Sequence, residues 1–258
     1  MATSTVAIIT GASKEIGQAT AVRLSQDFSS LVLVARNREG LLETANLVAK
    51  SGAAKTLLLS LDLSDSESAN TIVTRTLAEF GRIDALVKIA GAVPQIDLFD
   101  MDDAAWDSGF NLKFHGARRL TIRSWDSLKA TGGSVILISG NSAEAPKAPF
   151  AAVACVNAAI IALAKAFSDR GIQNGVQVNS ILPGPVMTGR RRTYLEKWAP
   201  YHNMTMEEAM KAFPTEDGIT RFGEPEEISE LMAFVLSPAA KWMTGSALRM
   251  DGGEIKSI

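Results

Sequence analysis

The turn Thr10–Gly17, with the sequence TGASKEIG, follows the apolar run Val6–Ile9 and precedes a segment with helical periodicity. Gly11 permits a sharp turn, and Gly17 lets the following helix lie close to the strand. In such a strand–turn–helix unit, the backbone N–H groups at the start of the helix can bind a pyrophosphate. A glycine pair alone indicates only a tight turn, but this position between a strand and a helix favours a dinucleotide-binding site.

The rest of the chain alternates apolar runs with helix-period segments. Several of the apolar runs, such as LVLVA and SVILI, lack a polar–apolar alternation, which is typical of parallel strands covered on both faces. The predicted strands are 5–10, 31–35, 55–60, 83–89, 134–138, 175–181 and 246–250, and the predicted helices are 15–28, 38–51, 66–80, 102–129, 150–170 and 225–237. This order predicts an α/β fold, a Rossmann-type doubly wound parallel sheet of about seven strands with helices on both faces, in a single domain over 1–258.

Segment 189–221 interrupts this alternation. It contains turns with tryptophan and tyrosine, and Thr205 and Glu208 form a capping box that predicts one short helix. Because an insertion after the sixth strand lies at the carboxyl ends of the strands, where ligands bind, we expect 189–221 to be a substrate lid.

Composition narrows the possible partners and location. The net charge of −2 gives no reason to expect nucleic acid or an anionic membrane as a partner. The single cysteine, Cys155, excludes an intrachain disulfide and fits the cytoplasm, and the two histidines form no metal-binding motif. The N-terminus lacks the features of a signal peptide, and the longest apolar segment, 150–167, contains Asn157 and Lys165, so a buried helix is expected rather than a membrane span.

Two basic residues indicate which dinucleotide would bind. The second predicted strand ends in Ala35-Arg36, where an NAD enzyme would have a carboxylate for the ribose 2′-hydroxyl. Arg36 and Lys14 could instead bind a 2′-phosphate, because a guanidinium and an ammonium suit that dianion. The sequence therefore favours NADP(H) over NAD(H).

A set of motifs in a fixed order indicates a known family. They are TGASKEIG, Asp62-Leu63, Ala90-Gly91, Asn111, Pro183–Thr188, Arg221–Glu227 and Asp251–Gly253. In these motifs the chain resembles the short-chain dehydrogenases/reductases over nearly its whole length. The resemblance implies that Asp62 meets the adenine amine, that Val186 offers backbone bonds to the carboxamide, and that Thr188 covers the nicotinamide.

The resemblance and the charge argument together give the following cofactor-binding residues: Gly11, Ser13, Lys14, Ile16, Gly17, Arg36, Asp62, Leu63, Ala90, Gly91, Pro183, Gly184, Val186 and Thr188. The apolar helices 102–129 and 150–170 also resemble those that form a four-helix interface in the family. A homodimer or homotetramer formed through them is therefore expected.

The catalytic pattern of the family is incomplete. Members of the family reduce carbonyls with an Asn-Ser-Tyr-Lys set, in which the tyrosine donates a proton while hydride arrives. Alignment through the 150–170 helix places Gly140, Val153 and Asn157 at the serine, tyrosine and lysine positions, and leaves only Asn111. Standard carbonyl reduction is therefore not expected.

Other polar residues could act in place of the missing groups. Lys88 replaces an asparagine of the family's Asn-Asn-Ala-Gly, and it could return an ammonium to the site, although reaching water or pairing with a local acid is the ordinary fate of such a lysine. His115 could shuttle a proton or simply pack on its helix. Ser142 and Asn157 could hydrogen-bond a ligand.

Three charged or aromatic features leave alternatives open. Glu15 replaces the middle glycine of the turn, so its carboxylate either favours the start of a helix or repels a pyrophosphate. Arg190–Arg192 could attract an anionic substrate or be a solvated run. Tyr194 could enter the site from the lid or pack there.

These residues allow three functions. The first is an NADP(H)-dependent oxidoreductase acting on an activated C=N or C=C substrate, which does not need a strong phenolic acid. The second is a catalytically silent protein that binds a nucleotide or metabolite. The third is a non-redox enzyme on the same fold, which Glu15 would favour.

Overall fold

The computed structural model describes residues 4–52 and 54–257, and its centre is a parallel sheet of seven strands. The strands are β1 (Val6–Thr10), β2 (Ser30–Ala35), β3 (Lys55–Ser60), β4 (Ala85–Lys88), β5 (Ser134–Ile138), β6 (Gln177–Pro183) and β7 (Ala247–Met250). They lie in the order β3-β2-β1-β4-β5-β6-β7. The predicted fold class is confirmed, and each predicted strand overlaps an observed one.

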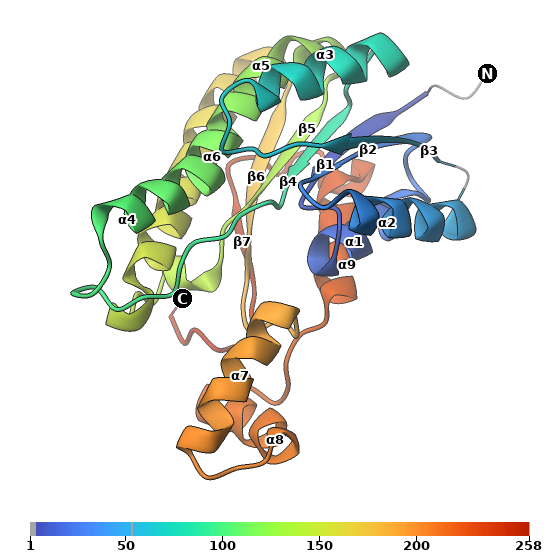
Figure 1. Cartoon of the computed structure of the whole chain (residues 1–258). Helices are drawn as coiled ribbons and strands as arrows, with labels where there is room; N and C mark the ends of the chain where they lie inside the picture. Colours follow the sequence, from blue (N-terminus) through green and yellow to red (C-terminus); the bar gives the residue numbers. More distant parts are fainter. Residues whose placement is uncertain (1–3, 53, 258) are drawn as a thin grey trace.

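Helices cover both faces of the sheet (Figure 1). One face carries α3 (Ser68–Phe80), α5 (Gly116–Thr131) and α6 (Ala151–Asn174), and the other carries α1 (Glu15–Leu24), α2 (Arg38–Ser51) and α9 (Pro225–Leu236). The remaining helices are α4 (Asp103–Gly109), α7 (Gly189–Tyr201) and α8 (Met206–Glu216).

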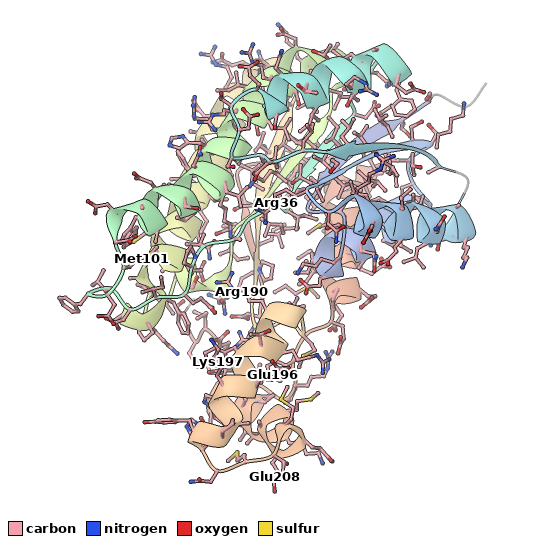
Figure 2. All side chains as sticks on the ribbon, in the orientation of Figure 1. Arg36, Met101, Arg190, Glu196, Lys197 and Glu208 are labelled. Atoms are coloured by element: carbon pink, nitrogen blue, oxygen red, sulfur yellow. The ribbon has the colours of Figure 1, made fainter. Side chains whose placement is uncertain are left out.

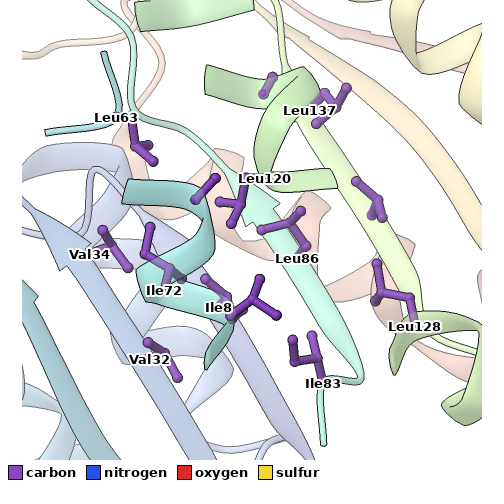
Figure 3. Packing of buried hydrophobic residues seen from close by; sticks show 14 of the residues in the cluster. Ile8, Val32, Val34, Leu63, Ile72, Ile83, Leu86, Leu120, Leu128 and Leu137 are labelled. Carbon is purple, nitrogen blue, oxygen red and sulfur yellow. The ribbon is translucent and has the colours of Figure 1, made fainter. Parts of the chain in front are cut away.

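The alternation of side chains along each strand explains these two layers. In β1, Val6 and Ile8 point into the core beneath α3 and α5, while Ala7 and Ile9 point into the core beneath α1 and α9. All four side chains are fully buried. Figure 3 shows the first of these cores, in which Ile8 lies among Val32, Ile72 and Leu86.

The turn after β1 requires a close approach between α1 and the strand end. A Cβ at Gly17 would lie 1.9 Å from the carbonyl oxygen of Gly11, so no larger residue fits without a shift of the backbone. This contact brings the first turn of α1 directly to the end of β1. It places the N–H groups of that helix at the carboxyl edge of the sheet.

The predicted continuous helix 102–129 is interrupted. A π-helical turn, Phe110–His115, lies between α4 and α5. The ammonium of Lys88 donates to the main-chain carbonyl oxygens of Leu112 and Lys113 within this turn. The i→i+5 hydrogen bonds of a π-helical turn cannot be predicted from the apolar spacing of the sequence.

Segment 189–221 projects from the carboxyl ends of the strands (Figure 1). It contains two helices, whereas the sequence predicted one. The expected capping box of Thr205 and Glu208 begins α8. The prediction missed α7, whose first turn is basic and contains no acid, although Thr188 caps its backbone by accepting from the N–H of Arg191.

Residues 148–174, which include α6, are long and apolar enough to cross a membrane by composition, although only part of this stretch is buried within the protein. In the fold, α6 packs against β5 and β6, with Ile160 and Ala164 in the core. A core helix of an α/β domain meets the same criterion.

Candidate functional site

Two adjoining clefts open at the carboxyl ends of the strands. The first, which we call the turn cleft, has a volume of about 1120 Å³ and is lined by the 11–17 turn, the ends of β2 and β3, and residues 89–95. The second, the Asn157 cleft, has a volume of about 640 Å³ and lies between β5, α6 and segment 189–221. Ile16, Gln95, Lys113 and Arg190 line both clefts, which therefore adjoin one another.

The structure brings the predicted cofactor-binding residues together in these clefts. The turn cleft is lined by Gly11, Ser13, Lys14, Ile16, Gly17, Arg36, Asp62, Leu63, Ala90 and Gly91. The Asn157 cleft is lined by Pro183, Gly184, Val186 and Thr188. Segments that are far apart in the sequence thus form one continuous groove along the strand ends.

The basic residues of the turn cleft are available to a ligand. The side chains of Arg36 and Lys14 are 70% and 75% exposed. A guanidinium nitrogen of Arg36 lies 3.7 Å from a carboxylate oxygen of Asp62, and the other oxygen of Asp62 accepts from the backbone N–H and hydroxyl of Ser64. These bonds from Ser64, with the charge of Arg36, lower the pKa of Asp62 below its usual value. Figure 2 shows Arg36 near the centre of the molecule and Arg190 at the start of α7.

The carboxylate of Glu15 bridges the turn and segment 189–221. Its backbone is in the left-handed region, with φ 52°, where the family has glycine. Its Oε1 accepts from the backbone N–H of Gly189 at 2.7 Å and lies 3.9 Å from the ammonium of Lys14. Of the two alternatives for Glu15, the carboxylate interacts favourably with the start of a helix. That helix is α7 and not α1, which contains Glu15 itself.

Gly140, Val153 and Asn157, the positions that the sequence aligned with the family's Ser-Tyr-Lys set, line the Asn157 cleft together. Asn157 is buried, and its amide nitrogen donates to the hydroxyl of Ser142 at 2.9 Å. A Cβ at Gly140 would lie 2.6 Å from that amide nitrogen, so a serine at 140 would clash with Asn157 as it is placed. Val153 lines the same cleft with an apolar side chain. Gly140 and Asn157 therefore fit each other.

An ammonium does reach this cleft, but it belongs to Lys113, which the sequence interpretation missed. Lys113 donates to the side-chain oxygen of Asn157 and to the main-chain oxygen of Ser139 at 2.9 Å. Lys113, Asn157 and Ser142 thus form a hydrogen-bonded chain, which we call the Lys113 chain. In the sequence, Lys113 is recognisable only as a charged residue within the apolar stretch FNLKF. The direction of its side chain could not be predicted, because the stretch forms a π-helical turn.

Lys88 follows neither of the ordinary fates expected for it. It is 2% exposed, and its ammonium donates to the main-chain oxygens of Ala90, Leu112 and Lys113 rather than reaching water or an acid. It does not line either cleft. Its role in the structure is to hold the π-helical turn that carries Lys113.

Asn111 and His115 lie outside the clefts, whereas Tyr194 lines one of them. The amide of Asn111 donates to the carbonyl of Ser64 at 3.0 Å and accepts from Arg119, and Asn111 lines neither cleft. His115 packs edge-on against Phe114, and burial with two neighbouring arginines lowers its pKa. Tyr194 lines the Asn157 cleft but packs against Phe213.

The ligand chemistry of a metal site is not found in the part of the chain that the structure describes. No group of three or more His, Cys, Asp or Glu side chains is placed to hold a metal ion among residues 4–52 and 54–257.

Comparisons with known proteins show which family the chain belongs to. A family model described as enoyl-(acyl carrier protein) reductase matches residues 11–254. The chain belongs to the short-chain dehydrogenase/reductase family. The predicted family is confirmed by the motifs, the sheet order and this match, which covers nearly the whole chain.

Individual members of the family are similar over their full length. The chain is 29% identical to the NADPH-dependent reductase BacG of Bacillus subtilis (98% of this chain and 98% of that protein), and 27% identical to the uncharacterized oxidoreductase YvaG of the same organism (98% and 96%). It superposes on L-sorbose reductase from Gluconobacter frateurii, solved with NADPH and L-sorbose, with a TM-score of 0.94 and 26% identity, covering 99% and 98% of the two chains.

Within this short-chain dehydrogenase/reductase, burial gives Lys113 unusual acid–base properties. Removal from water, and then the charge of Arg190, lower the pKa of its ammonium to about 7. Burial and the charge of Lys113 also hold the pKa of Lys88 well below its usual range. Lys113 can therefore release and take up a proton near neutral pH, in the cleft that Val153 and Asn157 line.

The substitution Lys113→Met should change how stability depends on pH. Between pH of about 7 and 10.5, unfolded Lys113 binds a proton that the folded protein releases, so folding becomes more favourable as pH rises. The free energy of unfolding of the wild type, relative to Lys113→Met, should rise through this range by up to about 1.4 kcal/mol per pH unit.

Urea unfolding at several pH values measures this difference. Lys129→Met, at an exposed position on α5, is the matched control and should leave the pH dependence unchanged. A difference between wild type and Lys113→Met that stays constant from pH 6 to about pH 10 would contradict the shifted pKa.

Proposed function

We propose that this short-chain dehydrogenase/reductase is an NADP(H)-dependent oxidoreductase that reduces an activated C=N or C=C bond. The observation that carries the cofactor choice is the pair of exposed cations, Lys14 and Arg36, on the rim of the turn cleft. The end of β2 offers a guanidinium where recognition of the 2′-hydroxyl would need a carboxylate. Two similar proteins support the same choice. BacG is named as NADPH-dependent, and L-sorbose reductase was solved with NADPH.

The residues of the two clefts fit such a dinucleotide. The 11–17 turn would hold the pyrophosphate at the start of α1, Asp62 and Leu63 the adenine, and Val186 and Thr188 the nicotinamide. Glu15 does not oppose this fit, because its carboxylate is bound by Gly189 and lies near Lys14. When bound, the reduced cofactor supplies hydride.

Ser142, at the end of the Lys113 chain, would donate the proton to the substrate and recover one from water, while Lys113 and Asn157 would hold its hydroxyl in place. Asn157 receives a hydrogen bond from Lys113 and donates one to the Ser142 hydroxyl oxygen, which leaves the Ser142 hydrogen free to donate into the cleft. A serine hydroxyl is a weak acid compared with the missing phenol, so a substrate whose C=N or C=C bond is already polarised suits this site better than a ketone. Val153 would provide an apolar wall beside it.

The substitution Arg36→Leu should weaken NADPH binding more than NADH binding. Arg36 would make a charge-assisted contact with the 2′-phosphate, a contact that NADH cannot make, so we expect about a tenfold or greater loss for NADPH alone. Fluorescence or calorimetric titration measures the dissociation constants of NADPH and NADH. Arg38→Leu, on the same loop and helix start but outside the turn cleft, should retain the wild-type preference; equal losses for both cofactors would refute the assignment of Arg36.

A substrate panel separates this function from its alternatives. NADPH oxidation should be measurable with cyclic iminium ions or enones that carry an electron-withdrawing group, and slow or absent with simple ketones. Rapid reduction of simple ketones would contradict the proposal. NADPH binding without hydride transfer across the panel would favour a silent binding protein, and failure to bind either cofactor would favour a non-redox enzyme.

The predicted oligomer also remains a proposal. A groove of about 540 Å³ between α5 and α6 is lined by Ile122, Trp125, Leu163 and Phe167, and Ile122 is 51% exposed. Such an apolar face supports a homodimer or homotetramer formed through these helices. Light scattering should give two or four chains, and Ile122→Glu should give a smaller species; a wild-type monomer at micromolar concentration would exclude this interface. The cytoplasmic location stays a prediction.

A further inference from the structure

Three consecutive arginines, Arg190–Arg192, occupy the first turn of α7. This is an unfavourable place for cations, because the N-terminal end of a helix carries partial positive charge. Their surroundings differ. Arg190 donates to the carbonyl oxygen of Val93 at 2.9 Å, Arg192 is exposed, and Arg191 is half-buried in the Asn157 cleft.

Aromatic rings surround the guanidinium of Arg191. Its central carbon lies 5.0 Å from the ring centre of Phe213, 5.6 Å from that of Tyr194 and 5.9 Å from that of Phe222. Cation–π contacts of this kind stabilise the charge, but they leave the N–H groups at the edge of the guanidinium without acceptors.

No such acceptor is found among residues 4–52 and 54–257. The only hydrogen bond of Arg191 besides those within α7 is the one from its backbone N–H to Thr188, and no carboxylate lies within 4.0 Å of its guanidinium. Asp217 and Glu254 line the same cleft and attract Arg191 from a greater distance. Glu254 is instead bonded to the amide of Asn141.

A half-buried guanidinium without a bonded partner is unfavourable unless a ligand supplies one. Its planar pair of N–H groups matches a carboxylate, which can accept two parallel hydrogen bonds. The rings of Tyr194 and Phe213 around it suit an apolar or aromatic body attached to that carboxylate. Arg191, Val153 and Asn157 line one cleft, so a single ligand can contact all of them.

We propose that Arg191 binds the carboxylate of the substrate, so that the substrate class is an apolar, preferably aromatic, carboxylic acid whose reducible bond lies beside Val153 and Asn157. This inference rests on the proposed function for the reducible bond, but the carboxylate site itself does not depend on hydride transfer. It also explains why only one of the three arginines is enclosed by rings.

Equilibrium binding of 2-naphthoate and its neutral analogue 2-naphthamide tests the site. Calorimetry with the full-length protein, with and without NADPH, should show that the acid binds at least about ten times more tightly than the amide, as a charge-assisted bidentate contact implies. Arg191→Met should abolish this preference, and Arg191→Lys should retain part of it. Arg192→Met, the matched control one residue away, should keep all of it.

Several outcomes would overturn the proposal. They are equal binding of acid and amide by the wild type, no measurable binding of the acid, and an equal loss in Arg192→Met, which would indicate general attraction by a basic surface. Thermal unfolding of each variant shows whether the ring cluster remains folded, and Arg191→Lys serves as the test if Arg191→Met does not fold. Failure of the proposed function would look different, since the preference for the acid would persist without NADPH oxidation by any carboxylic acid.

Discussion

The site depends on the hydrogen bonds that the ammonium of Lys88 donates to main-chain oxygens. This lysine is buried in a central strand, and its charge is bound by main-chain oxygens, including those of Leu112 and Lys113. These bonds take up acceptors of the helix and accompany its π-helical turn. The turn directs Lys113 toward Asn157, so a residue outside the clefts determines which polar group enters them.

The site has two parts, one around the turn cleft and one around Asn157. The part around the turn cleft contains the residues that were predicted to bind the dinucleotide, among them Gly11, Gly17 and Arg36, together with Glu15. The residues around Asn157 fit one another, because Gly140 leaves room for the Asn157 amide and Lys113 hydrogen-bonds its oxygen. Glu15 connects the two parts through its bond to Gly189 at the start of α7.

The sequence was sufficient for the fold, since apolar runs and a turn of fixed length determine which strand ends meet. It was not sufficient for the polar chain. The resemblance to the family placed Asn111 in the site and gave no role to Lys113, whereas in the structure Asn111 bonds to Ser64 and Lys113 reaches Ser139 and Asn157. It also missed α7, because the first turn of this helix contains no acid and the carboxylate at its start comes from the distant residue Glu15.

The acid–base behaviour of Lys113 is the central claim, and nuclear magnetic resonance measures it directly. In protein labelled with ¹⁵N at the lysine Nζ atoms, the signal that is absent from Lys113→Met belongs to Lys113 and can be followed through a pH titration. The midpoint of this titration should lie near the pKa of about 7 to which burial lowers the Lys113 ammonium. A midpoint near the ordinary lysine value of 10.5 would show that this ammonium is solvated and would contradict the account.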